Sequence, residues 1–149
     1  MPLCFIAPAP VYVGGIPETE WPKRVALSSD QCVIDGEHFF ILGNLDIPII
    51  GRDDPFRWSV WSSLSQKSFD RASELWDSIG RESEEPYFGW LSTNIPGYEP
   101  TLNLKLRVHT QPLGIRPLIE VAEQDHVLSR DQATGITWER ACELSHAAG

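Results

Sequence analysis

The side chains best suited to bind a charged group occupy one short stretch of the sequence that contains no acidic residue. Its members are Lys105, Arg107 and His109 at alternating positions, followed by Arg116. Because guanidinium and ammonium groups bind carboxylates and other anions, this stretch predicts a site for an anion or for a carboxylate of a partner. His109 would be its titratable member. The alternative is that these cations pair with carboxylates of the chain itself, such as those in residues 82–85.

Aromatic side chains offer a second kind of contact. The chain has six tryptophans, and most of them are expected in the core. Trp61 is predicted on the polar side of its strand, where either a helix or the N-terminal arm covers it or it belongs to a recognition surface. Trp90 and Tyr98 flank the turn-rich residues 94–100, where a pocket could form. We therefore add Trp61, Trp90 and Tyr98 to the basic residues as candidate binding residues.

The sequence offers weaker support for catalysis or for a bound metal. Cys32 could be a nucleophile with His38 or His109 as its base, but Asp30 and Asp35 flank it, and negative charges raise the pKa of a thiol. The four histidines lack metal-binding spacing, and no phosphate-loop or dinucleotide-binding motif occurs. We predict no catalytic residue, no metal site and no cofactor, and we lean against an enzyme.

Composition narrows the classes of partner. A formal net charge of −9 over 149 residues disfavours binding to nucleic acid, whose phosphates repel a net anion. No apolar run approaches the length of a membrane span. Three widely separated cysteines favour reduced thiols and a cytoplasmic protein over a secreted disulfide framework. The acidity is explained by solubility or by a basic protein partner.

Alternating apolar residues predict the strands that position these side chains. Residues 56–64 alternate most clearly, and we expect one buried side and one side open to water. Residues 104–110 alternate again, with Lys105, Arg107 and His109 facing outward, and residues 116–121 are the expected hairpin partner. Residues 38–43 and 87–91 are further strands, whereas residues 28–36 should form a short helical turn or loop.

Helical spacing predicts three helices. Ser65 is the expected cap of the first, whose apolar stripe runs to Ile79, and Gly80 should end it. Two short helices follow over residues 126–133 and 137–147. The order of the elements indicates an α+β fold with a mainly antiparallel sheet and helices packed on one face. We expect a single domain over residues 1–149, with residues 1–26 as an extended N-terminal arm and residues 27–149 as the core.

Several motifs in order resemble a bacterial family known as domain of unknown function 2199. They are residues 27–41, 58–65 and 85–91, Pro96-Gly-Tyr98, residues 101–105, 107–110 and 116–120, and Asp125-His126. Family members commonly begin with a Cys-x-x-Cys-Gly lead that looks like half of a metal-binding ribbon. This chain has Cys4 followed by residues 5–8 without a second cysteine. The resemblance implies a bacterial, cytoplasmic, single-domain protein and implies no activity.

Three functional hypotheses follow. The first is a non-enzymatic domain that binds another protein, for example an immunity or antitoxin-like factor whose acidic surface blocks a basic toxin. The second is a domain or enzyme that binds a small molecule or an anion around Arg107, His109 and Arg116, and a flat, open face at these residues would contradict it. The third is a structural role, including a homodimer joined through the sheet face around Trp61.

Overall fold

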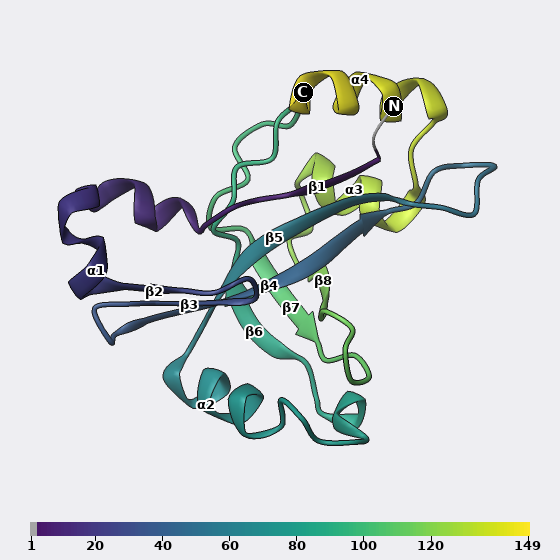
Figure 1. Cartoon of the computed structure of the whole chain (residues 1–149). Coiled ribbons are helices and arrows are strands. Elements are labelled where there is room, and N and C mark those ends of the chain that lie inside the picture. Colours follow the sequence, from purple (N-terminus) through teal and green to yellow (C-terminus); the bar gives the residue numbers. More distant parts are fainter. Residues whose placement is uncertain (1–2) are drawn as a thin grey trace.

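The computed structural model describes residues 3–149 and shows helices and strands in one α+β fold (Figure 1). The strands are β1 (Cys4–Ile6), β2 (Val25–Leu27), β3 (Gln31–Ile34), β4 (His38–Ile47), β5 (Phe56–Leu64), β6 (Tyr87–Trp90), β7 (Lys105–His109) and β8 (Leu118–Val121). The helices are α1 (Trp21–Arg24), α2 (Gln66–Glu74), α3 (Val127–Thr134) and α4 (Trp138–Ala148). Short 3-10 turns lie at Val11–Gly15, Glu18–Glu20 and Arg81–Ser83.

The hairpin of β4 and β5 forms the centre of the molecule. The two strands pair antiparallel along their length, from Phe39 opposite Leu64 to Ile47 opposite Phe56. Gly51 in the connecting turn has a φ of +81°, a conformation that glycine adopts without strain. Strand β5 has the bounds that the alternation of residues 56–64 predicts.

The sheet is mixed, so the prediction of a mainly antiparallel sheet is only partly confirmed. The strand order is β1-β5-β4-β8-β7-β6, with β2 and β3 continuing from the first part of β4. Strand β1 pairs with β5 in parallel, and β8 meets β4 in parallel at Leu118 and Asn44. Alternating apolar residues report which side of a strand is buried and not the direction of its neighbour, so the sequence could not show this.

The sheet curls until its last strand returns to β5. Leu91, just after β6, forms an antiparallel bridge with Ser62, and the amide of Ser92 donates to the carbonyl of Trp61 at 2.8 Å. Glycine is required at position 89, because a Cβ there would collide with the Ser62 hydroxyl and the Ser63 carbonyl. The sheet is therefore closed at this point, because the chain just after β6 pairs with β5, and the strands surround an interior.

The first hydrophobic core fills this interior and extends beneath the helices. Inward side chains of β4, β5, β7 and β8 meet Phe69 of α2, Leu128 of α3 and Leu144 of α4. Helix α2 lies at one end of the strands, and α3 and α4 lie at the other (Figure 1). All three helices contribute to this one core, although they lie at opposite ends of the strands and do not form one layer on a single face. Within residues 3–149 no helix is long and apolar enough to cross a membrane.

The opposite side of β4 and β5 is also covered, which overturns the prediction that one side of β5 is open to water. Trp61 is 1% exposed and packs with Val13 and Ile16 of the N-terminal arm, and its Nε1 donates to the carbonyl of Ala7 at 2.9 Å. Trp61 is therefore a buried side chain, and the arm covers it as one of the two alternatives anticipated.

The polar residues on this side satisfy one another across the two strands. The Ser59 hydroxyl donates to Asn44 Oδ1 at 2.7 Å, and Arg57 Nε donates to Asp46 Oδ1 at 2.7 Å. Both are register pairs of β4 and β5. Buried polar groups are tolerated when each finds a partner. The polar residues of β5 therefore pair with polar residues of β4; the pair of Ser59 and Asn44 is buried, whereas that of Arg57 and Asp46 is partly exposed.

The arm itself is only partly extended, contrary to the prediction for residues 1–26. Strand β1 is extended, but residues 11–24 form short helical turns, and β2 spans the predicted boundary at residue 27. The reason is local: Pro10 and Pro17 each precede a helical turn, where their fixed φ suits the N-terminal position. The arm folds back over β5 and covers Trp61.

The helix termini largely follow the sequence. Ser65 accepts from the amide of Ser68 and Thr137 accepts from the amide of Arg140, each at 3.1 Å. Helix α2 ends at Glu74, five residues before the predicted Ile79, and the chain then turns toward Gly80, whose φ is +85°. Residues 28–36, predicted to form a helical turn or loop, contain strand β3, because pairing with β4 outweighs their turn-forming composition.

The burial of the arm gives a first prediction. Ile16 is 6% exposed whereas Val11 in the same arm is 43% exposed. Ile16→Ala should lower the free energy of unfolding by about 2–4 kcal/mol, since it leaves a cavity in the hydrophobic cluster that Val13, Ile16 and Trp61 form beneath the arm. Val11→Ala is the matched control and should change it by less than about 0.5 kcal/mol. Urea denaturation measures both, and equal values would contradict a structural role for the arm.

The thiols give a second prediction. Cys32 is completely buried under the arm, and this burial raises its pKa to about 11. The direction agrees with the sequence argument, but the cause is burial and not the neighbouring carboxylates. We expect exposed Cys4 to react rapidly with a thiol reagent in the native protein, and Cys32 to react only after unfolding. Peptide mapping after a timed pulse of iodoacetamide would show this, and early labelling of Cys32 would refute it.

Candidate functional site

Three neighbouring strands present an open outer face. Leu106 and Val108 of β7 point into the first core, so the alternate residues of this strand point outward. The antiparallel register of β6, β7 and β8 brings the outward residues together. We call this surface the outer face; it consists of Phe88, Trp90, Lys105, Arg107, His109, Leu118 and Glu120.

An aromatic pair occupies the β6 side of the outer face. Phe88 and Trp90 are 53% and 42% exposed, and their rings meet edge to face with centroids 5.0 Å apart. In the register Phe88 lies opposite Arg107 and Trp90 lies opposite Lys105. Two large aromatic rings and two cations are therefore neighbours on a hydrogen-bonded sheet.

The charges of the outer face are partly paired, as one of the sequence alternatives anticipated. His109 Nε2 lies 2.9 Å from Glu120 Oε1, and Arg107 lies 3.8 Å from the same oxygen. The partner is this cross-strand carboxylate and not the acidic residues 82–85, among which Glu84 pairs with Arg71. Such exposed pairs contribute only about 0–1 kcal/mol. Among residues 3–149 no ion pair is formed by Lys105, so its charge is available.

The other predicted site residues lie elsewhere. Tyr98 donates from its hydroxyl to Asp131 at 2.6 Å, beneath Arg140, and burial together with this bond raises the pKa of its hydroxyl. It fastens the loop of residues 94–100 to α3 and α4. Arg116 donates to Asp30 at 2.8 Å at the edge of a cavity. The structure therefore brings Trp90, Lys105, Arg107 and His109 together and separates Trp61, Tyr98 and Arg116 from them.

The histidines are dispersed. His38 contacts the hydroxyl of Tyr12, His109 contacts Glu120, and His126 caps α3 by accepting from the amide of Leu128. His146 is exposed on α4. Over residues 3–149 no cluster of three or more histidine, cysteine, aspartate or glutamate side chains is arranged to hold a metal ion.

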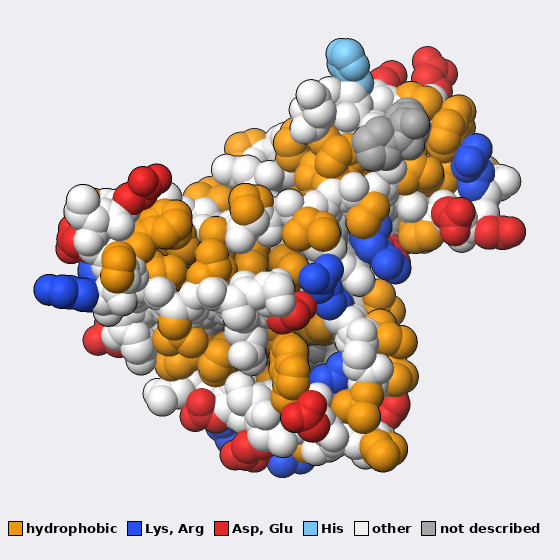
Figure 2. Space-filling model, in the orientation of Figure 1, with side chains coloured by type: hydrophobic (Ala, Val, Ile, Leu, Met, Phe, Trp, Pro, Cys, Tyr) orange, Lys and Arg blue, Asp and Glu red, His pale blue; other side chains and the backbone are white. Residues whose placement is uncertain are grey.

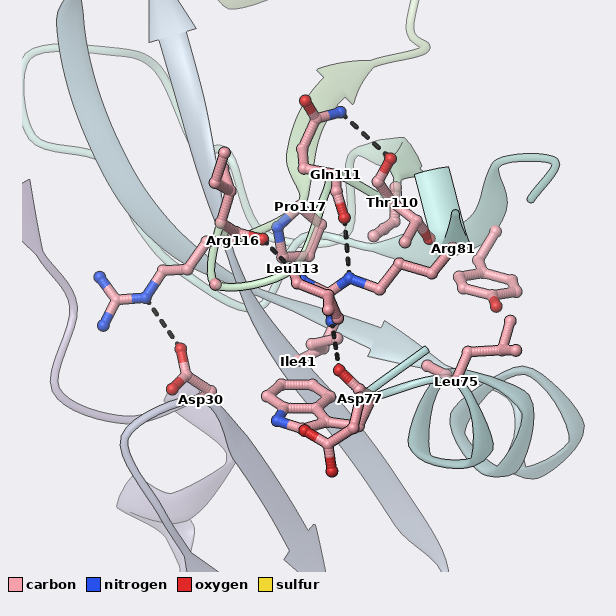
Figure 3. Close-up of a pocket in the computed structure, with 16 residues that line it drawn as sticks. Asp30, Ile41, Leu75, Asp77, Arg81, Thr110, Gln111, Leu113, Arg116 and Pro117 are labelled. Atoms are coloured by element: carbon pink, nitrogen blue, oxygen red, sulfur yellow. Dashed lines mark hydrogen bonds and ion pairs between the residues drawn. The ribbon is translucent and has the colours of Figure 1, made fainter. Parts of the chain in front are cut away.

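A cavity of about 320 Å³ lies between α2 and the loop that joins β7 to β8 (Figure 3). Its walls are mainly apolar and include Ile41, Ala72, Leu75, Val108 and Ile115. Such a volume falls at the lower end of the range of small-molecule sites. Asp30, Asp77, Arg81 and Arg116 provide the charged groups of the lining, and Tyr87 and Thr110 provide hydroxyls.

Arg81 holds two walls of the cavity together. Its guanidinium donates to the carbonyls of Gln111, Pro112 and Ile115 in the β7–β8 loop, at 2.8–3.1 Å, and to that of Trp76 after α2 at 3.0 Å. Figure 3 shows Arg81 extending from its own wall toward Gln111 and Leu113 of the loop. On the other side, the pair of Arg116 and Asp30 fastens the end of this loop to the turn before β3.

Phe88 and, apart from Arg116, the residues that line the cavity were not among the predicted site residues. Phe88 shares its strand face with Trp90, two positions away, so the alternation of residues 87–91 could have revealed the pair. Leu113 and Ile115 are exposed apolar residues in a loop, and apolar residues in a predicted loop can indicate a binding site. No sequence pattern indicated the role of Arg81, because the three loop carbonyls that it binds are 30 to 34 residues away.

The side of the molecule that carries the N-terminal arm and α4 has no single charged patch. Figure 2 shows acidic and basic side chains scattered among apolar ones there. The net charge of −9 is therefore not gathered on this side into a surface suited to a strongly basic partner.

Comparison with known proteins identifies the family. The sequence model of a family described as uncharacterized protein conserved in bacteria (DUF2199) matches residues 1–136, which include the N-terminal arm. No curated protein and no solved structure matches the chain. The chain belongs to the DUF2199 family of bacterial proteins.

Proposed function

We propose that this protein is a binding module that recognises another protein through the outer face of β6, β7 and β8. The observation that carries the proposal is the exposed pair of Phe88 and Trp90 beside Lys105 and Arg107. Aromatic residues and arginine are the side chains most enriched where proteins bind one another tightly.

The outer face is held rigid before any partner binds. Its strands are joined by backbone hydrogen bonds in a fixed register, and β6 is further held to β5 because the Ser63 hydroxyl accepts from the amide of Trp90 at 2.9 Å. A rigid surface loses little conformational entropy on binding. The long side chains of Lys105 and Arg107 can still adjust to a partner.

The chemistry of the face suggests the chemistry of the partner. An apolar side chain would cover Phe88 and Trp90, and a carboxylate would reach Lys105 and Arg107, where a charge-assisted hydrogen bond forms. This partner differs from the basic toxin of the immunity hypothesis, which would seek an acidic surface. We expect the encounter to take place in the cytoplasm, in keeping with the three free thiols.

The two other hypotheses lose support on the geometry. Arg107 and His109 lie on an open face where both approach Glu120, whereas Arg116 lines the cavity beside α2, so the three residues do not share one site. A homodimer through the sheet face around Trp61 is less favoured, because the N-terminal arm covers that face.

Photo-crosslinking tests the proposal in a bacterial host that carries the gene. We expect p-benzoylphenylalanine in place of Phe88 to give a protein adduct of defined mass, identified by mass spectrometry. The same residue in place of Ile50, which is 63% exposed in the β4–β5 turn, is the control and should give none. An adduct with nucleic acid or with a second copy of this chain would overturn the proposal.

Variants then measure the binding of the purified partner. Trp90→Ala should weaken it at least about 30-fold, the loss expected at the centre of an interface, and Lys105→Glu about tenfold. Trp138→Ala on α4 is the matched control, because Trp138 is similarly exposed but lies outside the outer face, and it should change affinity less than twofold. Tighter binding by Lys105→Glu would instead indicate a basic partner, and an unchanged Trp90→Ala would reject the outer face.

A further inference from the structure

The cavity between α2 and the β7–β8 loop is independent of the outer face. Val108, which points inward from β7, lines the cavity, whereas Arg107 and His109 on either side of it point outward. Its walls come from β4, α2 and the loop, so segments far apart in the sequence converge on one space. A role for the cavity therefore does not rest on the proposed function.

The walls are fixed in place by two arginines. Arg81 donates to three backbone carbonyls of the β7–β8 loop and to that of Trp76 on the α2 side, and Arg116 donates to Asp30. The bonds to the loop and to Asp30 join segments far apart in the sequence and hold the loop against the α2 side of the cavity. A ligand that binds here would not have to order the loop, so binding would not carry the entropy cost that weakens the affinity of many small-molecule sites.

The hydrogen-bonding groups of the lining indicate an uncharged ligand. Arg81 is engaged by four backbone carbonyls and the charge of Arg116 is balanced by Asp30, so an anion buried in the cavity would gain little from either guanidinium. The Tyr87 hydroxyl donates to Glu84 at 3.3 Å, and burial raises its pKa, so it stays neutral at physiological pH. Burying an unpaired charge among these apolar walls would be costly.

Asp77 offers a hydrogen-bond acceptor at the mouth of the cavity. The carboxylate of Asp77, exposed at the end of the wall formed by α2 and the turn after it, has no ion-pair or hydrogen-bond partner within residues 3–149. It can accept a hydrogen bond from a hydroxyl or N–H group of a ligand. The positive charge of Arg81 lies on the same wall, and it disfavours a cationic ligand there.

From these features we infer that the cavity binds a small, uncharged, largely apolar molecule that carries one hydroxyl or N–H donor. Its ring or chain lies on Ile41, Leu75 and Val108, and its donor faces Asp77. A volume of about 320 Å³ corresponds to about ten water molecules at ~30 Å³ each, which limits the ligand to roughly the size of two fused rings.

Three compounds that share one ring system test the inference on the full chain. We expect neutral 2-naphthol to bind with a dissociation constant on the order of 1 mM or tighter by calorimetry. Anionic 2-naphthoate and cationic 2-naphthylmethylamine should each bind at least about tenfold more weakly. Absence of naphthol binding, or tighter binding of a charged analogue, would overturn the inference.

Substitutions locate the binding. Ala72→Phe places a ring in the cavity from α2 and should abolish naphthol binding, and the smaller Ala72→Leu should weaken it partially. Ala133→Phe makes the same change at an exposed position of α3, outside the cavity lining, and should leave binding intact. Asp77→Ala should weaken binding about fivefold to tenfold through loss of the acceptor.

The melting temperature of each variant would be measured to check that the fold is retained. If Ala72→Phe lowers it, Ala72→Leu and Asp77→Ala still decide the matter, because leucine is smaller than phenylalanine and Asp77 has no hydrogen-bond or ion-pair partner among residues 3–149. Binding that survives both Ala72 substitutions would place naphthol elsewhere and reject the cavity. None of these results depends on whether the outer face binds a protein.

Discussion

The whole architecture depends on the burial of the β4–β5 hairpin on both of its sides. One side faces the first core, which the three larger helices complete, and the other carries Trp61 against Val13 and Ile16. A strand pair of this length must have its backbone groups paired and its two surfaces covered. The N-terminal arm is therefore a structural part of the fold, and its short helical turns give it the bulk that a single extended strand lacks.

Closure of the sheet is the second consequence of this arrangement. Strand β6 lies at the opposite end of the strand order, beyond β4, β8 and β7, yet the chain just after it returns to β5 through Leu91 and Ser92. Gly89 makes the approach sterically possible. The free half of β8 is covered by α3, because the amide side chain of Gln132 donates to the carbonyl of Ile119 and accepts from the amide of Val121. Covered edges of this kind protect a sheet from pairing with other chains.

A single strand supplies both surfaces discussed above. Because successive side chains of β7 point to opposite sides, Val108 lines the cavity while Arg107 and His109 reach the outer face. The two sites differ in how they are stabilised: the outer face rests on backbone pairing, whereas the cavity rests on the side chains of Arg81 and Arg116. A rigid scaffold of this type can present a flat surface and a concave one with little cost to either.

Most helices and strands could be predicted from the amino-acid sequence, since their signals are local. The alternation of residues 56–64 and 104–110, the caps at Ser65 and Thr137, and the motifs shared with the family each depend on neighbours within a few residues. The outward direction of Lys105, Arg107 and His109 belongs to this group.

Tertiary structure alone decided what covers each surface. The polar residues Ser59 and Arg57 suggested a side open to water, but their partners Asn44 and Asp46 lie on the next strand, and the arm over Trp61 begins some 50 positions earlier. The parallel pairings, the pairing of His109 with Glu120 and the clamp of Arg81 likewise join residues distant in sequence. The physical reason is that a residue's own periodicity fixes the direction of its side chain, whereas the chain's long-range path fixes what that side chain meets.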